Sequence, residues 1–500
     1  MATPRPALVR LHRWLGVPLC LLFLVWFPTG IVMMYCGFPE VTDADRVAHL
    51  PALDASAIHV LPLDAAAAAG IAAPRDLRLA TFDGRPIYRV RSATADAVVY
   101  ADTGERRTGV ARAAIARAAV AWTGRRIDSA RVERLDDVDQ WTVALPFDAL
   151  RPLWKFSWPD GEEIYVSQAS GEVVQETTTR SRRGAWLGPI PHWLYFTPLR
   201  RHNARWRAVV MSTSGAATLA AILGLTIGIP IFSPRRRYRI ASAPARLPYR
   251  GRKRQHVIAG IAFGVVAATW AFSGLLSMDP WTGRGPERPR ALDDLARALR
   301  GDLPLDRFAA RPPAAALRAL AGFRVHELEL AAIGGDAAYV ATLDGGETRV
   351  VALDGTPSRE VDRDRLTRAA TSAAAANGGA TISLLTAYDR YYQDRRGHLP
   401  LPILLVDIHD AERSRGYVDP ATARVAGTYS SRQWSERWLY HGLHSLELPW
   451  IYRRRPLWDI VVIVCMAGGT ALAATATSLA WAVVRRRRRR AAPARGPGTR

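Results

Sequence analysis

Four long apolar stretches without a charged residue constrain this chain more than any other feature of its sequence. None of them contains Asp, Glu, Lys or Arg, and they cover residues 14–36, 208–232, 257–278 and 460–484. Each exceeds the roughly 18 apolar residues that indicate a membrane-spanning helix. The sequence therefore predicts four transmembrane helices. Most of the 500 residues lie outside these stretches, which excludes a transporter built almost entirely in the bilayer.

The charge distribution predicts how the chain is oriented. The net charge of +23 is concentrated in three tracts without acidic residues, 1–13, 233–256 and 485–500. A chain that crosses four times places all three on one side, which the positive-inside rule identifies as the cytoplasm. We therefore expect a bacterial inner-membrane protein with cytoplasmic termini, a retained first helix and two periplasmic segments, 37–207 and 279–459. The arginine-rich tail is interpreted as an anchor near anionic lipid, so no nucleic acid partner is expected.

The chain also aligns with itself at two offsets, 244 and 252 residues. At the first offset, five residues meet equivalents: His12 with His256, Gly16 with Gly260, Trp26 with Trp270, Thr29 with Ser273 and Gly30 with Gly274. At the second, a longer set does so: Tyr165, Val166, Val173, Arg180, Trp186, His192, Trp206, Val209 and Val210 meet Tyr417, Val418, Val425, Arg432, Trp438, His444, Trp458, Val461 and Val462. The coincidences predict two parallel tandem repeats, each consisting of a helix, an exterior domain and a helix.

Both exterior segments have the pattern of an α+β domain. An Ala-rich helical stretch, 64–72 or 314–321, precedes residues that alternate between apolar and polar as in β-strands. A second group of strands is expected in 163–176 and 415–429. Hairpin turns are predicted at Asp83-Gly84, Thr103-Gly104, Gly345-Gly346 and Asp354-Gly355. The predicted fold class is an α+β membrane protein in which an exterior α+β domain is inserted between the two helices of each repeat.

Several motifs resemble a known family. A short helix followed by strands and a hairpin, YADTGE or YVDPATARVAG, is similar to the PepSY domain. The membrane-proximal motifs resemble the PepSY-associated transmembrane family, also called iron-regulated membrane proteins: LHRWLG at 11–16, HWLYFTPLRRH at 192–202, YDRYYQDRRGHLPLP at 388–402 and WLYHGLHSLELPWIYRRRPLWDIVVI at 438–463. The similarity covers nearly the whole chain. Members characterised as ferric-siderophore reductases carry haem in the helical bundle and reduce iron outside the inner membrane, so the resemblance implies the same for this chain.

Two symmetric histidine pairs are the candidate haem ligands. Ionisable residues at membrane depth are functional by default, and a haem iron can be held by neutral imidazoles from opposite sides. We expect one or two haems b: His12 and His256 are the candidate ligands near the cytoplasmic face, and His192 and His444 are those near the outer face. The alternative is that these histidines cap helix ends at the interface.

Two further histidines are alternative outer ligands, His202 and His441. The spacing of three residues places His441 on the same helix face as His444. The remaining histidines are expected in solvent: His49, His59, His326, His398 and His409. The HELEL sequence at 326–330 is not HExxH, so a zinc peptidase site is absent. The three cysteines, Cys20, Cys36 and Cys465, have no CxxC spacing and predict neither disulfides nor a thiolate metal site.

The cluster Tyr388-Asp389-Arg390-Tyr391-Tyr392 is the candidate substrate site. Aromatic rings and a guanidinium group together suit an anionic or catecholate ligand. The alternative is a strand and turn whose tyrosines pack on the domain core. The first segment has Asp139-Gln140-Trp141 at the equivalent position, so the two halves differ here.

The absence of nucleotide-binding motifs limits the source of electrons. The chain has no GxGxxG after a strand and no GxxxxGK[ST]. A separate cytoplasmic reductase or a quinol from the bilayer would have to supply electrons, and the chain would pass them to a periplasmic ferric chelate. The rival hypothesis is a non-enzymatic protein whose anchored PepSY-like domains bind peptides, proteases or envelope partners. Transport of the chelate is disfavoured, because the spans contain no Gly/Pro-interrupted pair with intramembrane charges.

Overall fold

A bundle of four long helices forms one end of the molecule. The computed structural model describes residues 6–280 and 288–491. Within this part of the chain, four helices are long and apolar enough to cross a membrane: α1 (Pro6–Met33), α8 (Asn203–Ile231), α9 (Gly251–Leu276) and α14 (Leu457–Ala491). They coincide with the four predicted stretches, so the protein is a multi-pass membrane protein with large extramembrane α+β segments.

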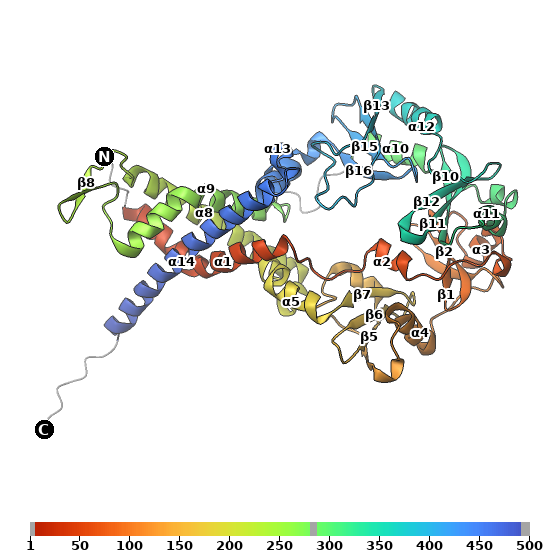
Figure 1. Cartoon of the computed structure of the whole chain (residues 1–500), viewed down its shortest axis with the longest axis horizontal. Coiled ribbons are helices and arrows are strands. Elements are labelled where there is room, and N and C mark those ends of the chain that lie inside the picture. Colours follow the sequence, from red (N-terminus) through yellow and green to blue (C-terminus); the bar gives the residue numbers. More distant parts are fainter. Residues whose placement is uncertain (1–5, 281–287, 492–500) are drawn as a thin grey trace.

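The four helices pack in a closed ring. Helix α1 contacts α8 and α14, and α9 contacts the same two neighbours, so α1 and α9 lie diagonally opposite each other. Gly468 and Gly469 of α14 permit close packing, because a Cβ atom at either position would collide with the ring of Phe263 or Phe27. The hairpin of β8 (Tyr238–Ile240) and β9 (Ala243–Ala245) lies at one end of the bundle, and the larger sheets lie beyond the other (Figure 1).

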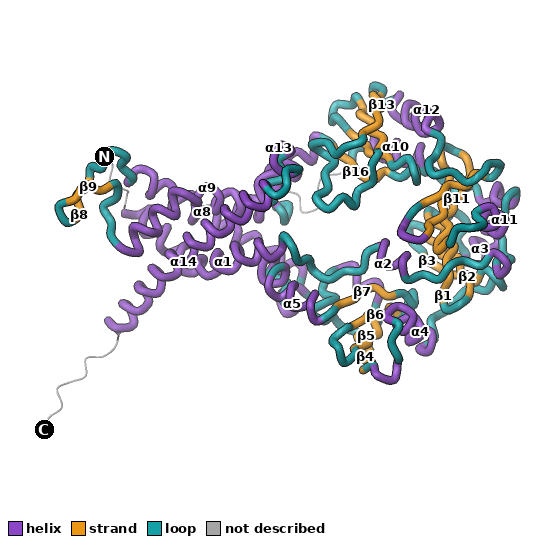
Figure 2. The backbone as a smooth tube through the Cα atoms, in the orientation of Figure 1, coloured by secondary structure: helices purple, strands orange, loops and turns teal. Residues whose placement is uncertain are grey.

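Strands from both exterior segments form one six-stranded sheet, in the order β12-β11-β10-β1-β2-β3. Its members are β1 (Asp76–Phe82), β2 (Arg85–Arg91), β3 (Asp96–Tyr100), β10 (Val325–Ile333), β11 (Asp336–Leu343) and β12 (Thr348–Ala352). The two halves meet where β1 pairs antiparallel with β10, with Leu77 opposite Leu330 and Leu79 opposite Leu328. The sequence analysis did not predict this shared sheet, which joins the two segments at the end of the molecule away from the helix bundle (Figure 2).

One face of the shared sheet is the main exterior core. Leu77, Leu79, Leu328 and Leu330 are buried on it, together with residues of α3 (Pro62–Ala69) and α11 (Pro313–Ala319). These two helices confirm the Ala-rich helical stretches. Asp83-Gly84 joins β1 to β2 and Gly345-Gly346 joins β11 to β12, as predicted, and the positive φ angles of Asp83 and Gly84 suit a tight hairpin.

The opposite face carries charged residues across the junction. Glu327 is 4% exposed, and its two oxygens accept hydrogen bonds from Arg46 at 2.8 Å and Arg78 at 3.0 Å. Arg46 belongs to α2 (Asp43–Ala48) in the first segment. Burial alone would raise the pKa of Glu327, but the hydrogen bond from Arg46 and the charges of Arg46 and Arg78 outweigh it and lower that pKa. One carboxylate from the second segment therefore holds two guanidinium groups from the first.

Each segment then forms a four-stranded antiparallel sheet with a helix before it. The first consists of α4 (Arg112–Thr123), β4 (Arg131–Leu135), β5 (Leu153–Ser157), β6 (Glu163–Ser167) and β7 (Val173–Thr177). The second consists of α12 (Arg363–Ala375), β13 (Ala380–Leu385), β14 (Ile403–Ile408), β15 (Arg415–Val418) and β16 (Val425–Tyr429). The second strand groups expected from the sequence are thus present as β6 with β7 and β15 with β16.

Short helices return each segment to the bundle. In the first they are α5 (Thr179–Leu187), α6 (Pro189–Trp193) and α7 (Thr197–Arg200); in the second they are a π-helical element, η7 (Ser435–Gly442), and α13 (Pro449–Tyr452). The remaining elements are α10 (Arg290–Leu299), η1 (Ala55–Ala57), η2 (Ile127–Ser129), η3 (Leu145–Leu150), η4 (Leu305–Ala309), η5 (Asp344–Gly346) and η6 (Ser431–Gln433). Helix α6 packs against α1. Residues of α6 therefore reach the end of the bundle nearest the exterior segments, although they precede α8 in the sequence.

Replacing Glu327 by Gln should loosen the junction between the two segments. The variant removes the charge that binds two partly buried guanidinium groups, of which Arg78 retains Asp76 at 2.9 Å, and we expect a cost of roughly 1–3 kcal/mol. Hydrogen–deuterium exchange of the variant should show faster exchange in β1 and β10. The control Glu133→Gln changes an exposed carboxylate of β4 and should leave the exchange of β1 and β10 unaltered. The pKa of Glu327 is lowered in the folded protein. The contribution of its carboxylate to stability is therefore fully present above the ordinary pKa of 4.5, and it is lost as the pH falls from that value through the folded pKa. Equal exchange in both variants would contradict this role.

Candidate functional site

The outer histidine pair lies where the return helices meet the bundle. The ring centres of His192, on α6, and His444, two residues after η7, are 6.2 Å apart, and their planes make an angle of 73°. His192 lies well before the first residue of α8, yet its Nδ1 is 3.1 Å from the carbonyl oxygen of Trp26 on α1. The packing of α6 on α1 therefore gives His192 the same depth as His444.

Hydroxyl groups fix which nitrogen of each outer ring carries the proton. His192 Nδ1 is 3.1 Å from Thr29 Oγ1, and His444 Nδ1 is 2.9 Å from Ser273 Oγ. The Thr29 hydroxyl donates its own proton to carbonyl oxygens of α1, and Ser273 donates to the carbonyl of Trp270. When the hydroxyl protons go to these carbonyls, each hydroxyl accepts a hydrogen bond from Nδ1–H, and the Nε2 lone pair of the histidine is then available.

The inner pair repeats this arrangement on the diagonal helices of the bundle. The ring centres of His12 on α1 and His256 on α9 are 6.3 Å apart, with an interplanar angle of 36°. His12 Nδ1 donates to the carbonyl of Ala220 at 2.9 Å. His256 Nδ1 is 3.1 Å from Thr475 Oγ1, whose proton is donated to Leu472. With this tautomer all four rings carry the proton on Nδ1, and within the described residues none of the four Nε2 atoms has a hydrogen-bond partner.

Glycines leave space beside three of the four rings. A Cβ atom at Gly224 would lie 3.0 Å from His12 Cε1, one at Gly30 would lie 3.5 Å from His192 Cε1, and one at Gly274 would lie 3.8 Å from His444 Cε1. Gly30 and Gly274 are among the residues that coincide at the 244-residue offset. A Cβ atom would press on the imidazole at position 224 only, because the distances at positions 30 and 274 are ordinary van der Waals contacts.

A cavity of about 280 Å³ adjoins the outer pair. Besides the two histidines, aromatic residues from both halves line it: Phe23, Trp26, Phe27, Trp193, Tyr195, Trp206, Trp270 and Tyr440. The Nε1 atom of Trp26 is buried and has no partner in the described chain. Loss of hydration lowers the pKa of His192 to about 3 and that of His444 to about 4, so both imidazoles are neutral at physiological pH, the form that ligates metals.

The spacing of both pairs allows one metal ion to be bound from two sides. A metal–nitrogen bond of about 2 Å places two imidazoles on opposite sides of one ion with ring centres about 6 Å apart, close to the observed 6.2 and 6.3 Å. His12 and Thr29 are seventeen residues apart on α1, so the two levels are separated by roughly 25 Å along the bundle. Among the described residues, no group of three or more His, Cys, Asp or Glu could hold a metal ion.

The other predicted histidines lie elsewhere. His202 is exposed at the start of α8. His441 has a side chain that is 41% exposed, and its Nδ1 is 3.8 Å from Glu447; the ring of Tyr440 lies between it and His444. Of the five histidines expected in solvent, four are exposed. The expectation was wrong for His326, which is 4% exposed. The loop that contains Leu50 covers the start of β10, and the Leu50 carbonyl is hydrogen-bonded to Nδ1 of His326.

The Tyr388–Tyr392 loop is held against β15 and β16. Tyr392 stacks on Tyr417 with ring centres 4.6 Å apart, and Tyr391 stacks on Tyr429 at 3.8 Å. Asp389 accepts a hydrogen bond of 2.8 Å from the Tyr417 hydroxyl. The tyrosines therefore pack on the core of the second four-stranded sheet, while the side chain of Arg390 is exposed.

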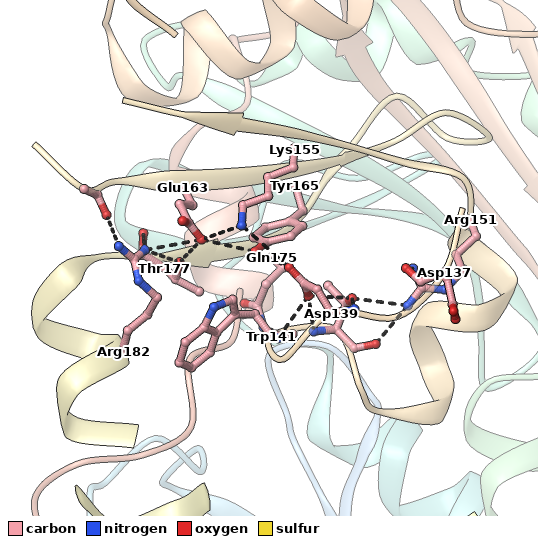
Figure 3. Close-up of polar contacts among 12 residues, drawn as sticks. Asp137, Asp139, Trp141, Arg151, Lys155, Glu163, Tyr165, Gln175, Thr177 and Arg182 are labelled. Atoms are coloured by element: carbon pink, nitrogen blue, oxygen red, sulfur yellow. Dashed lines mark hydrogen bonds and ion pairs between the residues drawn. The ribbon is translucent and has the colours of Figure 1, made fainter. Parts of the chain in front are cut away.

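The first segment contains a related polar cluster (Figure 3). Asp139 accepts a hydrogen bond of 2.8 Å from Tyr165, and burial raises the pKa of that tyrosine. Lys155 lies 3.1 Å from Glu163, and Arg182 of α5 donates to Thr177 at 2.8 Å. The cluster joins the first four-stranded sheet to α5, the helix that precedes the one carrying His192.

The sequence analysis missed the hydroxyl partners of the histidines. Thr29 and Ser273 coincide at the 244-residue offset, which was the available signal. Their role depends on the return helices that bring His192 and His444 against them, and spacing alone does not reveal this.

Comparison with known proteins identifies the family. The model of the PepSY-associated TM region matches residues 9–342. No curated protein and no solved structure matches the chain. The matched residues include α1, the first exterior segment, α8, α9 and the strands β10 and β11 of the shared sheet. Since the match covers more than half of the chain, this protein belongs to the PepSY-associated TM region family.

Proposed function

We propose that this protein carries electrons outward across the bacterial inner membrane through two b-type haems and reduces a ferric chelate in the periplasm. His12 and His256 would hold the inner haem, and His192 and His444 the outer one. The observation that carries the proposal is the 6.2–6.3 Å spacing of two imidazole pairs, each aimed by hydrogen bonds at Nδ1. A structural histidine that merely caps a helix does not need an equivalent partner across the bundle.

The residues fit a haem better than a bare metal ion. Each pair supplies only two nitrogen ligands, and the described chain offers no third ligand group. A porphyrin provides the remaining nitrogens in the plane between the rings. The aromatic cavity around His192 and His444 suits a flat apolar macrocycle, and the buried Nε1 of Trp26 would gain a neighbour there.

An internal repeat supports equal depths for the members of each pair. Beyond the sequence coincidences, Asp139 accepts from Tyr165 as Asp389 does from Tyr417, both at 2.8 Å. Likewise, Trp206 Nε1 donates to the carbonyl of Trp193, the residue after His192, and Trp458 Nε1 donates to Ser445, the residue after His444. We therefore propose that the chain is a tandem duplication with an approximate twofold axis along the bundle.

The chain's own residues would orient and shield the cofactor. When bound, haem supplies reversible one-electron transfer at its iron. Thr29 and Ser273 hold the outer imidazoles with Nε2 directed inward, Ala220 and Thr475 do so for the inner pair, and the aromatic lining excludes water. Such hydrogen bonds at Nδ1 also make the ligating nitrogen more basic.

The charge distribution supports the proposed direction. The basic hairpin of β8 and β9 and the arginine-rich end of α14 lie at the end of the bundle nearest His12 and His256, so that end would face the cytoplasm. The electron donor would be a separate cytoplasmic reductase or a quinol from the bilayer. The enzyme activity would be that of a ferric-chelate reductase.

Two haems per chain should be measured in a pyridine haemochrome assay of the protein expressed with sufficient haem. His444→Ala and His12→Ala should each remove or shift one haem signal, because each change removes one of two axial nitrogens. His441→Ala is the matched control and should leave the spectrum unchanged. Protein without haem that co-purifies with an envelope partner would instead favour an anchored binding protein.

Thr29→Val should retain the outer haem but change its midpoint potential. The substitution preserves shape and removes one of the two acceptors of His192 Nδ1–H, leaving the Trp26 carbonyl. A tenfold change in relative affinity for the two oxidation states corresponds to about 59 mV. Redox titration followed by optical absorption measures the shift, and Thr29→Ser should restore the original value. Thr269→Val removes a hydroxyl that bonds only its own helix α9 and should have no effect. Identical potentials in Thr29→Val and the wild type would contradict the role of Thr29.

A further inference from the structure

We infer that helix α5 lies in the membrane surface and binds the phosphate groups of anionic lipids, in the leaflet on the side of the exterior segments. Its lipid-binding surface, termed the α5 face, consists of Arg180, Arg183, Trp186 and Leu187. Helix α5 lies outside the four spans, and the inference holds whether or not the bundle carries haem.

Helix α5 has an inner and an outer side. On the inner side, Ala185 is buried in the core beneath the first four-stranded sheet. Arg182 also faces inward, because it donates hydrogen bonds of 2.8 Å to Thr177 and to the carbonyl of Gly161. The residues of the α5 face recur at spacings of three or four positions, which places them together on the helix. All four are exposed, so the α5 face is the outer side.

The end of α5 packs against the end of the first span. A Cβ atom at Gly188, the residue after α5, would lie 3.0 Å from Val32 Cγ1 and 3.4 Å from Cγ of Met33, the last residue of α1. Just before this contact, Trp186 is 49% and Leu187 is 65% exposed. These two side chains therefore lie at the level where α1 leaves the bilayer (Figure 1), and exposed tryptophans are typical of that level.

The two arginines of the α5 face have no anionic partner within the described chain. Among the described residues, neither Arg180 nor Arg183 forms an ion pair or a side-chain hydrogen bond. No acidic residue occurs in the sequence between Glu176 and Asp279. The positive-inside rule does not account for these arginines, because they lie at the end of the bundle opposite the three basic tracts. The arrangement fits an anion from outside the protein.

A phospholipid fits the α5 face better than a soluble anion, because charged and apolar side chains share it. The helix rises roughly 10 Å from Arg180 to Leu187, and the headgroup layer on each side of a bilayer is roughly 5–8 Å thick. Long arginine side chains extend into that layer, where a guanidinium forms two hydrogen bonds with one phosphate. Trp186 and Leu187 would contact the acyl chains below. The order of groups along α5 thus matches that of an anionic bilayer surface.

The second segment has no equivalent surface. At the 252-residue offset, the counterparts of the α5 face are Arg432, Ser435, Trp438 and Leu439. Arg432 is ion-paired with Glu412, and Ser435 carries no charge. Trp438 is half-buried, with its ring edge-on to Tyr391. The lipid contact therefore belongs to the first segment, in which α5 continues directly into α6, the helix that carries His192.

Hydrogen–deuterium exchange of the full-length protein in nanodiscs tests the contact at α5 itself. Exchange of α5 should be severalfold slower in nanodiscs that contain phosphatidylglycerol than in nanodiscs of phosphatidylcholine alone. Arg180→Gln/Arg183→Gln should remove this difference, because each arginine near an anionic surface strengthens association about fivefold. The measurement is local to α5, so the basic tracts at the other end of the bundle do not contribute to it.

The matched control is Arg318→Gln/Arg359→Gln, which removes two exposed arginines on α11 and between β12 and α12. It should leave the difference unchanged, as should Arg180→Lys/Arg183→Lys, which keeps both charges. Equal exchange of α5 in the two lipids, a difference that persists in the Gln variant, or its loss in the control or the Lys variant would overturn the inference. Equal slowing by inorganic phosphate in phosphatidylcholine nanodiscs would assign the arginines to a soluble anion and overturn the lipid contact.

Leu187→Ala tests the apolar part of the α5 face. The substitution removes apolar surface that would be buried among acyl chains, so exchange of α5 should become severalfold faster in both lipids. Leu63→Ala changes a leucine of α3 that is 51% exposed and distant from the bundle, and it should leave exchange of α5 unaltered. Unchanged exchange in Leu187→Ala would place α5 outside the membrane surface and contradict the inference.

Discussion

The hydrogen bond at Nδ1 of each bundle histidine is the interaction on which the candidate site depends. A hydroxyl whose proton is already donated, or a carbonyl, can only accept, so it fixes the proton on Nδ1 and leaves Nε2 as a lone pair. Without these four bonds the rings could rotate or exchange tautomers. With them, the ring centres of the two imidazoles in each pair lie 6.2 or 6.3 Å apart, a spacing that matches two imidazole ligands on opposite sides of one metal ion.

The exterior architecture keeps the outer pair in place. The return helices of both segments carry His192 and His444, and the shared six-stranded sheet joins those segments through β1 and β10. Glu327 strengthens the joint by binding Arg46 and Arg78. The molecule is thus closed at the bundle and again at the shared sheet, which limits how far the two outer histidines can separate.

Sequence reasoning predicted the four spans and the α+β segments, because the length of an apolar stretch and the alternation of a strand are local patterns. It also predicted the proximity of His12 to His256 and of His192 to His444, because these rare residues recur at fixed offsets along the chain. It could not predict the shared sheet, since alternation defines the faces of a strand but not its partner. The burial of His326 was missed for a related reason: it depends on a distant loop, not on the residues around it. Thr29 and Ser273 were paired when the chain was aligned with itself, but their hydrogen bonds to the histidines arise only from tertiary packing.

Electron paramagnetic resonance of the oxidised, purified protein tests the central claim most directly. Two axial imidazoles make ferric haem low-spin, and the angle between their planes sets the principal g values. The account predicts two low-spin signals of equal intensity with different g values, because the planes of the inner and outer pairs differ by 36° and 73°. A high-spin signal, which indicates a missing axial nitrogen, or the absence of any haem signal would contradict it.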